Sequence, residues 1–234
     1  MKSKIIIFTD LDGTLLDKTK FHFRQAKKYI NELISKNIII IPISSKTEKE
    51  IRLFLREIKH NLPFVTENGS EIYNLNLLKK TFPRKITLAR NKLKIYEIFN
   101  KKIDPQILEN CEFVFKMTKR KQTKILGLKG KKLNASLHRK FTFPFIFRGS
   151  KFKKNKLLKD TNKIGLNILE GGRVMNLGDK IDKGYAVNKI LKLTKNKLKS
   201  KIHTIAVGDN SNDLSMLNVS EYPCIIGNKN LKIK

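Results

Sequence analysis

The chain of 234 residues is poor in cysteine, tryptophan and acidic side chains, and each shortage narrows what it can be. The two cysteines, Cys111 and Cys224, match neither a disulfide framework nor a zinc site. No stretch approaches the roughly 20 consecutive apolar residues of a membrane span. The apolar run Ile5–Phe8 is also too short for the central region of a signal peptide. We therefore expect a cytoplasmic protein with no membrane segment.

Acidic residues are outnumbered, with 20 Asp and Glu against 51 Lys and Arg, which gives a formal net charge of +31. A strongly basic chain suggests a nucleic-acid partner. However, lysines dominate this excess and are spread along the chain, whereas proteins that read bases concentrate charge on one face and favour Arg. We expect no specific nucleic-acid partner and interpret the excess as a lysine-rich surface.

Apolar runs typical of buried strands alternate with helical stripes near both ends of the chain. The strands are expected at Lys4–Thr9, Ile38–Ile43, Phe64–Thr66, Ile202–Val207 and Pro223–Ile226. Helices are expected over residues 22–36, after a capping box at Ser45-x-x-Glu48, and over a stripe that includes Ala186 and Leu191. This alternation predicts right-handed βαβ units and a parallel sheet.

The middle of the chain follows a different pattern, with strand candidates that form hairpins. We expect strands that include Phe113–Met117, Phe141–Phe147, Gly165–Glu170 and Arg173–Leu177. Gly171-Gly172 is interpreted as a two-residue hairpin turn, and Lys151–Lys163 as a basic helix or loop. The predicted organisation is an α/β core, residues 1–83 and 177–234, that is interrupted by an α+β insertion, residues 84–176.

Four of the nine aspartates form two clusters, each at the end of a predicted strand. Asp10 and Asp12 follow the first strand, and Asp209 and Asp213 follow the strand that ends at Val207. Ligands bind at the carboxyl ends of parallel strands, so both clusters are expected at one edge of the sheet. An Asx-turn would explain Asp10-x-Asp12 alone, but two clusters together favour a site. Carboxylates this close repel one another unless a cation is bound, which predicts a Mg²⁺ site.

These residues resemble the four motifs of the haloacid dehalogenase superfamily of phosphotransferases, in the order in which that family has them. The motifs are Asp10-x-Asp12-Gly13-Thr14, Ser44, Lys183 and Gly208-Asp209-x-x-Asn212-Asp213. The insertion is similar to the cap of the Cof-type (class IIB) sugar phosphatases. The resemblance implies a Rossmann-like parallel-sheet core with an inserted α+β cap domain of the C2B type.

Shorter signatures resemble one group within that family, the mannosyl-3-phosphoglycerate phosphatases. They are Pro42-Ile-Ser44-Ser45-Lys46-Thr47, Thr66-Glu67-Asn68-Gly69-Ser70, Phe143-Pro144-Phe145, and Gly171-Gly172-Arg173 followed by Asp182-Lys183-Gly184. This resemblance implies a Mg²⁺-dependent phosphatase that converts mannosyl-3-phosphoglycerate into mannosylglycerate and phosphate. The implied partner is therefore a small phosphorylated sugar–glycerate.

The resemblance also implies a role for each matched residue. Asp10 would attack phosphorus to form an aspartyl-phosphate, and Asp12 would act as general acid and then as general base. The metal would be held by Asp10, the backbone carbonyl of Asp12 and Asp209, with Asp213 in or near the outer sphere. The phosphoryl group would be bound at Asp10 by Ser44 and Lys183. In the cap, Arg173 beside Gly171 and Gly172, and also Arg139, are the candidates for contact with the substrate.

Several alternatives remain open at this point. Ser44 could simply end its strand, Ser45 could cap the following helix with Glu48, and Lys183 is one of many lysines. A generic Cof-type sugar phosphatase and a phosphomannomutase-like phosphotransferase share the same core and cap. A basic nucleic-acid-binding protein that has kept the phosphatase fold is a further alternative. The oligomeric state does not follow from the sequence.

Overall fold

A computed structural model describes residues 3–16, 24–198, 200–227 and 231–233 of the chain. Its contacts divide the chain into two compact units. The first unit consists of three segments, Met1–Ser45, Ile51–Leu88 and Asp182–Lys234. The second unit consists of two segments, Lys46–Glu50 and Ala89–Ile181. The expected boundaries, 83/84 and 176/177, each fall five residues before those at which the contacts change. The difference arises because β5 (Lys85–Thr87) pairs within the first unit, whereas β9 (Met175–Asp179) belongs to a sheet of the second.

The first unit contains a four-stranded, wholly parallel sheet in the order β11-β10-β1-β2. These strands are β11 (Tyr222–Ile225), β10 (Lys201–Gly208), β1 (Ser3–Thr9) and β2 (Ile39–Pro42). A parallel bridge from Ile43 to Val65 brings β3 (Phe64–Thr66) beside β2, and β3 continues into antiparallel β4 (Glu71–Tyr73) and β5. The predicted parallel α/β core is therefore present, and the carboxyl ends of β1, β2 and β10 lie at one edge.

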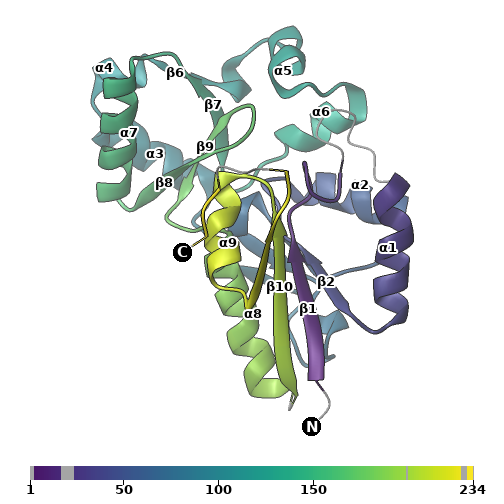
Figure 1. Ribbon diagram of the computed structural model, residues 1–234. Coiled ribbons are helices and arrows are strands. Elements are labelled where there is room, and N and C mark those ends of the chain that lie inside the picture. Colours follow the sequence, from purple (N-terminus) through teal and green to yellow (C-terminus); the bar gives the residue numbers. More distant parts are fainter. Residues whose placement is uncertain (1–2, 17–23, 199, 228–230, 234) are drawn as a thin grey trace. The chain divides into compact units, whose positions relative to one another are not determined.

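Two hydrophobic cores hold helices against this sheet (Figure 1). One contains Ile6 and Phe8 of β1 together with α8 (Lys183–Lys197) and α9 (Leu214–Asn218). The other contains Ile40 of β2 together with α1 (Arg24–Ser35) and α2 (Glu48–Ile58). Each apolar side chain that becomes fully buried in this way contributes about 1.5–3 kcal/mol. Packing therefore fixes the strands whose ends carry the acidic clusters.

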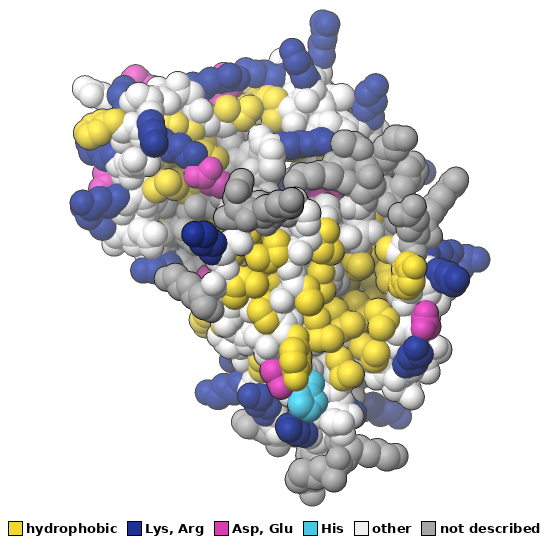
Figure 2. Space-filling view, in the orientation of Figure 1, with side chains coloured by type: hydrophobic (Ala, Val, Ile, Leu, Met, Phe, Trp, Pro, Cys, Tyr) yellow, Lys and Arg dark blue, Asp and Glu magenta, His cyan; other side chains and the backbone are white. Residues whose placement is uncertain are grey.

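Part of one sheet face stays accessible to solvent. Along β10, Thr204 and Ala206 are buried beneath the helices, whereas the alternating Ile205 and Val207 are only half-buried. The β11 residues Tyr222 and Cys224 are exposed on the same face, where they pair with Ile205 and Val207 of β10. Ile5 of β1 also lies on this face and is 37% exposed. Figure 2 shows hydrophobic side chains gathered over this part of the first unit. We call Ile5, Ile7, Ile205, Val207, Tyr222 and Cys224 the open sheet face.

The second unit is built on an antiparallel sheet in the order β6-β7-β9-β8. Its strands are β6 (Cys111–Phe113), β7 (Phe143–Phe147), β9 and β8 (Leu166–Glu170). Ile95 and Phe99 of α3 (Lys92–Lys102) and Leu157 of α7 (Lys151–Lys163) pack into its core. Three shorter helices complete it, α4 (Pro105–Leu108), α5 (Lys119–Leu126) and α6 (Gly130–Leu137). The expected α+β insertion is thus present as a separate core.

Two local predictions within this unit are wrong. The strand expected through Met117 ends at Phe113, because the chain enters a 3₁₀ turn over Val114–Lys116 that leaves Phe115 47% exposed. The hairpin between β8 and β9 has a four-residue loop, since Glu170 pairs with Met175 and the Gly171 N–H donates to the Val174 carbonyl at 3.0 Å. Neither Gly171 nor Gly172 has the positive φ that a two-residue turn requires.

The capping box before α2 lies two residues later than predicted. Thr47 Oγ1 accepts from the Glu50 N–H at 3.2 Å, and Glu50 Oε2 accepts from the Thr47 N–H at 2.9 Å. Both Ser45-x-x-Glu48 and Thr47-x-x-Glu50 have the required spacing. The backbone of Ser44 still donates to the Val65 carbonyl at 3.1 Å, so the extended conformation continues past β2 and the later pair caps the helix.

Among the described residues, every helix is either too short or too polar to cross a lipid bilayer.

Candidate active site

Three sequence-predicted residues follow neighbouring strands and meet at one edge of the sheet. Asp10 follows β1, Ser44 follows β2 and Asp209 follows β10. The Asp10 N–H donates to the Val207 carbonyl at 2.9 Å, which continues the pairing of β1 with β10 up to the site. All three side chains are buried, so this edge of the sheet carries a buried polar cluster with two carboxyl groups.

Lys183 reaches this cluster from the first turn of α8. The helix is capped by Asp182, whose Oδ1 accepts from the Tyr185 N–H at 2.8 Å. The Lys183 ammonium lies 2.5 Å from Asp10 Oδ1 and 2.6 Å from Asp213 Oδ1, and the side chain is fully buried. A buried cation is stable only with such partners, so the sequence-predicted Lys183, Asp10 and Asp213 form one ionic cluster.

Asp213 also organises the loop that follows β10. Its Oδ2 accepts from the backbone N–H groups of Asp209 and Asn210, each at 3.0 Å, as part of a capping box with Asn210. Gly208 is needed beside it, because a Cβ at that position would lie 2.5 Å from the Asp213 Cβ. Asp213 therefore holds both the Lys183 ammonium and the backbone of Asp209.

Burial has the largest effect on the electrostatics of this cluster. Removal from water raises the pKa of Asp10 to about 7, and the carboxylates of Asp213 and Asp12 act in the same direction, while Lys183 opposes them. Burial alone would lower the pKa of Lys183, but Asp10 and Asp213 hold it above its usual value. Lys183 is therefore charged, and ionisation of Asp10 near neutral pH depends on the cations beside it.

The acidic residues fit a hard metal ion. Asp10, Asp209 and Asp213 each offer a carboxylate oxygen, and the three atoms lie within 4.8 Å of one another. Oxygen donors of this kind suit Mg²⁺. Both Asp213 oxygens also accept hydrogen bonds from the protein, one from the Lys183 ammonium and the other from the Asp209 and Asn210 N–H groups. Gly13, at φ +89°, allows the Asp12 backbone to approach, since a Cβ there would lie 2.5 Å from Asp209 Oδ2.

The site includes a turn to which sequence reasoning gave no catalytic part, Glu67-Asn68-Gly69. The Asn68 N–H donates to the Ser44 carbonyl at 3.0 Å, and the Asn212 side-chain amide donates to Asn68 Oδ1 at 3.3 Å. The signal in the sequence was the Glu-Asn-Gly tripeptide after β3, which also suits an ordinary turn. Its position between the Ser44 and Asp209 loops became evident only from the tertiary structure.

Comparisons with known proteins agree with this geometry. Residues 7–234 match the family of haloacid dehalogenase-like hydrolases. The chain belongs to this family. Two glucosyl-3-phosphoglycerate/mannosyl-3-phosphoglycerate phosphatases are similar to it, one from Persephonella marina (30% identity over 97% of this chain and 87% of the relative) and one from Methanococcoides burtonii (28%, 95% and 85%). The predicted superfamily and the prediction of a phosphoric monoester hydrolase are thereby confirmed.

Solved structures show the same fold for this hydrolase. A haloacid dehalogenase-like hydrolase from B. subtilis aligns with a TM-score of 0.67 at 16% identity, over 94% of this chain and 88% of that one. The subclass IIB sugar phosphatase BT4131 aligns with a TM-score of 0.62 at 17% identity, over 96% and 87%. The predicted fold class, a parallel-sheet core with an inserted α+β domain, is confirmed.

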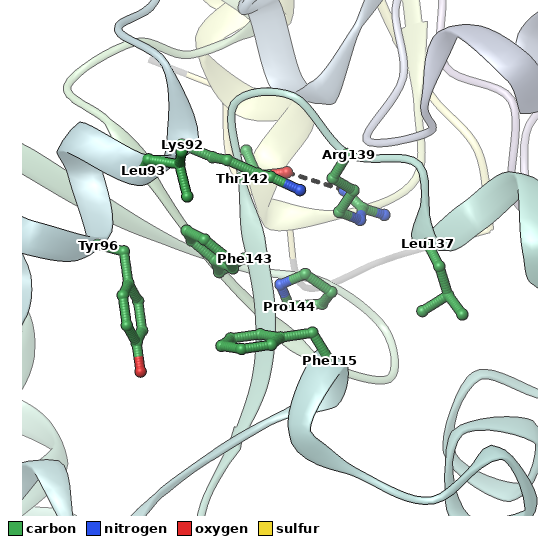
Figure 3. Close-up of a pocket in the computed structure, with 9 residues that line it drawn as sticks. All are labelled: Lys92, Leu93, Tyr96, Phe115, Leu137, Arg139, Thr142, Phe143 and Pro144. Carbon is green, nitrogen blue, oxygen red and sulfur yellow. Dashed lines mark hydrogen bonds between the residues drawn. The ribbon is translucent and has the colours of Figure 1, made fainter.

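The four predicted substrate-contact residues of the hydrolase all lie in its second unit, at two separate places. The Arg173 guanidinium, beside Gly171 and Gly172 in the β8–β9 loop, donates to the Leu126 carbonyl at the end of α5. Arg139 instead donates from Nη1 to Thr142 Oγ1 at 2.9 Å and borders a cavity of about 310 Å³. Figure 3 shows Lys92, Thr142 and Arg139 together at one part of this cavity, and the apolar Phe115, Phe143 and Pro144 at another.

Proposed function

We propose that this hydrolase is a Mg²⁺-dependent cytoplasmic phosphatase that converts mannosyl-3-phosphoglycerate into mannosylglycerate and phosphate. The observation that carries the proposal is the fully buried Lys183 held between Asp10 and Asp213 at the end of β1. A carboxylate beside a fixed ammonium can attack phosphorus while the charge of the phosphoryl group is neutralised. The names of the two similar phosphatases, which this chain covers over 85% of their length or more, support the choice of substrate.

The reaction would proceed in two steps at Asp10. In the first, an Asp10 carboxylate oxygen forms a bond to phosphorus, the bond from phosphorus to the glycerate oxygen breaks, and Asp12 gives its proton to that oxygen. In the second, Asp12 takes a proton from water, the water oxygen bonds to phosphorus, and the Asp10–phosphorus bond breaks to release phosphate. Ser44 and Lys183 would hold the phosphoryl oxygens in both steps.

Asp10, Asp209 and the backbone carbonyl of Asp12 would hold Mg²⁺, with Asp213 fixing the Asp209 loop. The bound ion would neutralise charge on the phosphoryl group and favour the ionised form of Asp10. In the second unit, Arg139 and Arg173, with the Gly171-Gly172 loop, would recognise the carboxylate and hydroxyls of the sugar–glycerate. Arg139 has the stronger support, because it borders a cavity next to a second cation, Lys92.

The test is phosphate release from a panel of substrates with MgCl₂ and with EDTA. Mannosyl- and glucosyl-3-phosphoglycerate should be hydrolysed best, EDTA should abolish release, and Asp10→Asn should lower kcat at least 10³-fold because it removes the nucleophile. Asp160→Asn is the matched control, since Asp160 pairs with Lys163 in the second unit and should leave kcat unchanged. Full activity of Asp10→Asn, or no release from any substrate in MgCl₂, would sink the proposal.

The same panel separates the alternatives. A preference for small hexose phosphates would indicate a generic Cof-type sugar phosphatase. A requirement for a bisphosphorylated activator, with isomerised product and no free phosphate, would indicate a phosphomannomutase-like transferase. Tight nucleic-acid binding without phosphate release would favour the nucleic-acid alternative, and that binding should fall steeply between 50 and 200 mM salt.

A further inference from the structure

The turn at Glu67-Asn68-Gly69 has an unusual backbone for a buried segment. All three residues have positive φ angles, 46°, 59° and 107°, and Glu67 and Asn68 are each only 2% exposed. Residues other than glycine seldom adopt such angles, and they persist where the surrounding structure requires them. Asn tolerates this conformation better than most residues. A buried, left-handed Asn is therefore a candidate for function.

This turn contacts three of the loops that carry the site. Its Asn68 N–H is bonded to the carbonyl of Ser44, and Asn68 Oδ1 accepts from Asn212, which lies between Asp209 and Asp213. Gly69 packs against the backbone of Asp182, the residue before Lys183, so closely that a Cβ there would overlap the Asp182 carbonyl oxygen. The Asn68 side chain is thus fixed at the meeting point of the Ser44, Asp209 and Lys183 loops.

Only one of the two polar atoms of the Asn68 side-chain amide is hydrogen-bonded in this arrangement. Its Oδ1 is bonded to Asn212, but its Nδ2 is buried and has no hydrogen-bond partner among the residues that the structure describes. A buried donor without a hydrogen-bond partner destabilises the folded protein, and such groups commonly bind a water molecule or a ligand. The ligand here has to supply an acceptor. Phosphoryl oxygens are acceptors, and they are the groups that Ser44 and Lys183 are expected to hold nearby.

We propose that Asn68 is a further binding residue of this hydrolase, whose Nδ2 donates a hydrogen bond to an oxygen of the bound phosphoryl group. This inference rests on the proposed phosphatase function, but it concerns the phosphoryl group alone and not the sugar. Inorganic phosphate, the product of any such reaction, is therefore a sufficient probe. Asn212 acts through Asn68, because its amide fixes which way the Asn68 amide is turned.

The test is the affinity for inorganic phosphate of the whole protein in MgCl₂, measured by isothermal titration calorimetry and by product inhibition. Asn68→Gly keeps the left-handed backbone and removes the donor, so it should weaken phosphate binding about tenfold to a hundredfold, as expected for a hydrogen bond to a charged group. Asn68→Asp keeps the shape and the acceptor but replaces the donor with a carboxylate, so it should weaken binding further. Binding of Mg²⁺ alone should not change in Asn68→Gly.

Asn74→Gly is the matched control. Asn74 is also left-handed, at φ 61°, and its amide donates to Asn61 Oδ1 and the Leu62 carbonyl, away from the site. It should lose stability and keep its phosphate affinity. The proposal is overturned if Asn68→Gly or Asn68→Asp binds phosphate as the wild type does, or if the wild type binds none. Phosphate binding that depends on Asn68, without hydrolysis of any sugar–glycerate, would refute only the proposed function.

Discussion

Lys183 is a charged side chain with no exposed surface, and two carboxylates share its single positive charge. A buried ionic cluster contributes little net stability to a protein. Removing one member, however, strongly lowers the free energy of unfolding, because an uncompensated charge stays buried. Without the lysine, Asp10 and Asp213 would face one another in a site that also holds Asp209. The stability of the first unit should therefore depend on a residue that the proposed reaction also uses.

We predict that Lys183→Met lowers the free energy of unfolding by about 3–5 kcal/mol in EDTA. MgCl₂ should restore part of this loss, because a cation bound by the same carboxylates replaces the missing positive charge. Urea unfolding in EDTA and in MgCl₂ measures both effects. Lys163→Met, at an exposed lysine of α7, is the control and should change stability by less than about 1 kcal/mol. Equal stability of Lys183→Met and the wild type in EDTA would contradict this account.

At the scale of single elements, the strands and helices with regular burial were predictable. In α8, Ala186, Val187, Ile190 and Leu191 repeat at helical spacing, and all four are buried. The acidic clusters were predictable for the same reason, since strands with continuous apolar runs place their ends at one sheet edge. The elements predicted wrongly, the end of β6 and the β8–β9 loop, depend on local backbone angles that apolar spacing does not encode.

Other details depended on contacts between segments distant in sequence. Ser45-x-x-Glu48 and Thr47-x-x-Glu50 both suit a capping box, and the pairing of Ser44 with Val65 decides between them. The role inferred for Asn68 could not be predicted from the sequence for a similar reason. Its partner Asn212 lies 144 positions away, and the Glu-Asn-Gly pattern by itself indicates only a turn.

The pair Arg90–Asp179 joins the two ends of the Ala89–Ile181 segment of the second unit. Arg90 donates from its backbone N–H to Asp179 Oδ2 at 2.8 Å and from Nη2 to Oδ1 at 2.6 Å, and Nη2 also reaches the Gly165 carbonyl. Burial would raise the pKa of Asp179, but the hydrogen bonds from Arg90 outweigh it and hold the pKa below its usual value. The stabilisation by this pair should therefore be present above about pH 4 and be lost as the pH falls further.

We predict that Asp179→Asn destabilises the second unit by about 1 kcal/mol at pH 7, a modest value because the Arg90 side chain is partly exposed. The difference from the wild type should be smaller at pH 3 than at pH 7, because the wild-type carboxyl group loses the same charge as the pH falls towards its lowered pKa. Urea unfolding at both pH values measures it. Asp160→Asn, in a longer and looser pair, should show little effect at either pH. A difference that grows on acidification would rule out the assignment.

At the scale of the whole molecule, the positive charge is unevenly distributed. Residues 113–159 contain no acidic side chain at all, although the chain as a whole carries 20. All of this stretch lies in the second unit, which also holds the predicted substrate-contact residues Arg139 and Arg173. Such a field attracts anions over distances of about a Debye length, which favours encounter with a phosphorylated carboxylate without any specific nucleic-acid contact.

The open sheet face and the net charge of +31 act in opposite directions on the solubility of the protein. At low ionic strength, repulsion between copies keeps the apolar patch from being buried against a neighbour. Salt shortens the reach of that repulsion, from about 10 Å at 0.1 M to about 3 Å at 1 M, and leaves the hydrophobic attraction intact.

We predict that self-association, measured by light scattering, increases from 50 mM to 1 M NaCl. Ile205→Lys should suppress the increase, whereas Leu93→Lys, at an exposed leucine of the second unit, should not. Association that falls with salt in the wild type would contradict this. Adding salt ordinarily helps to keep a basic protein in solution. For this chain, the partly exposed apolar residues of β1, β10 and β11 should make a buffer of low ionic strength the better choice.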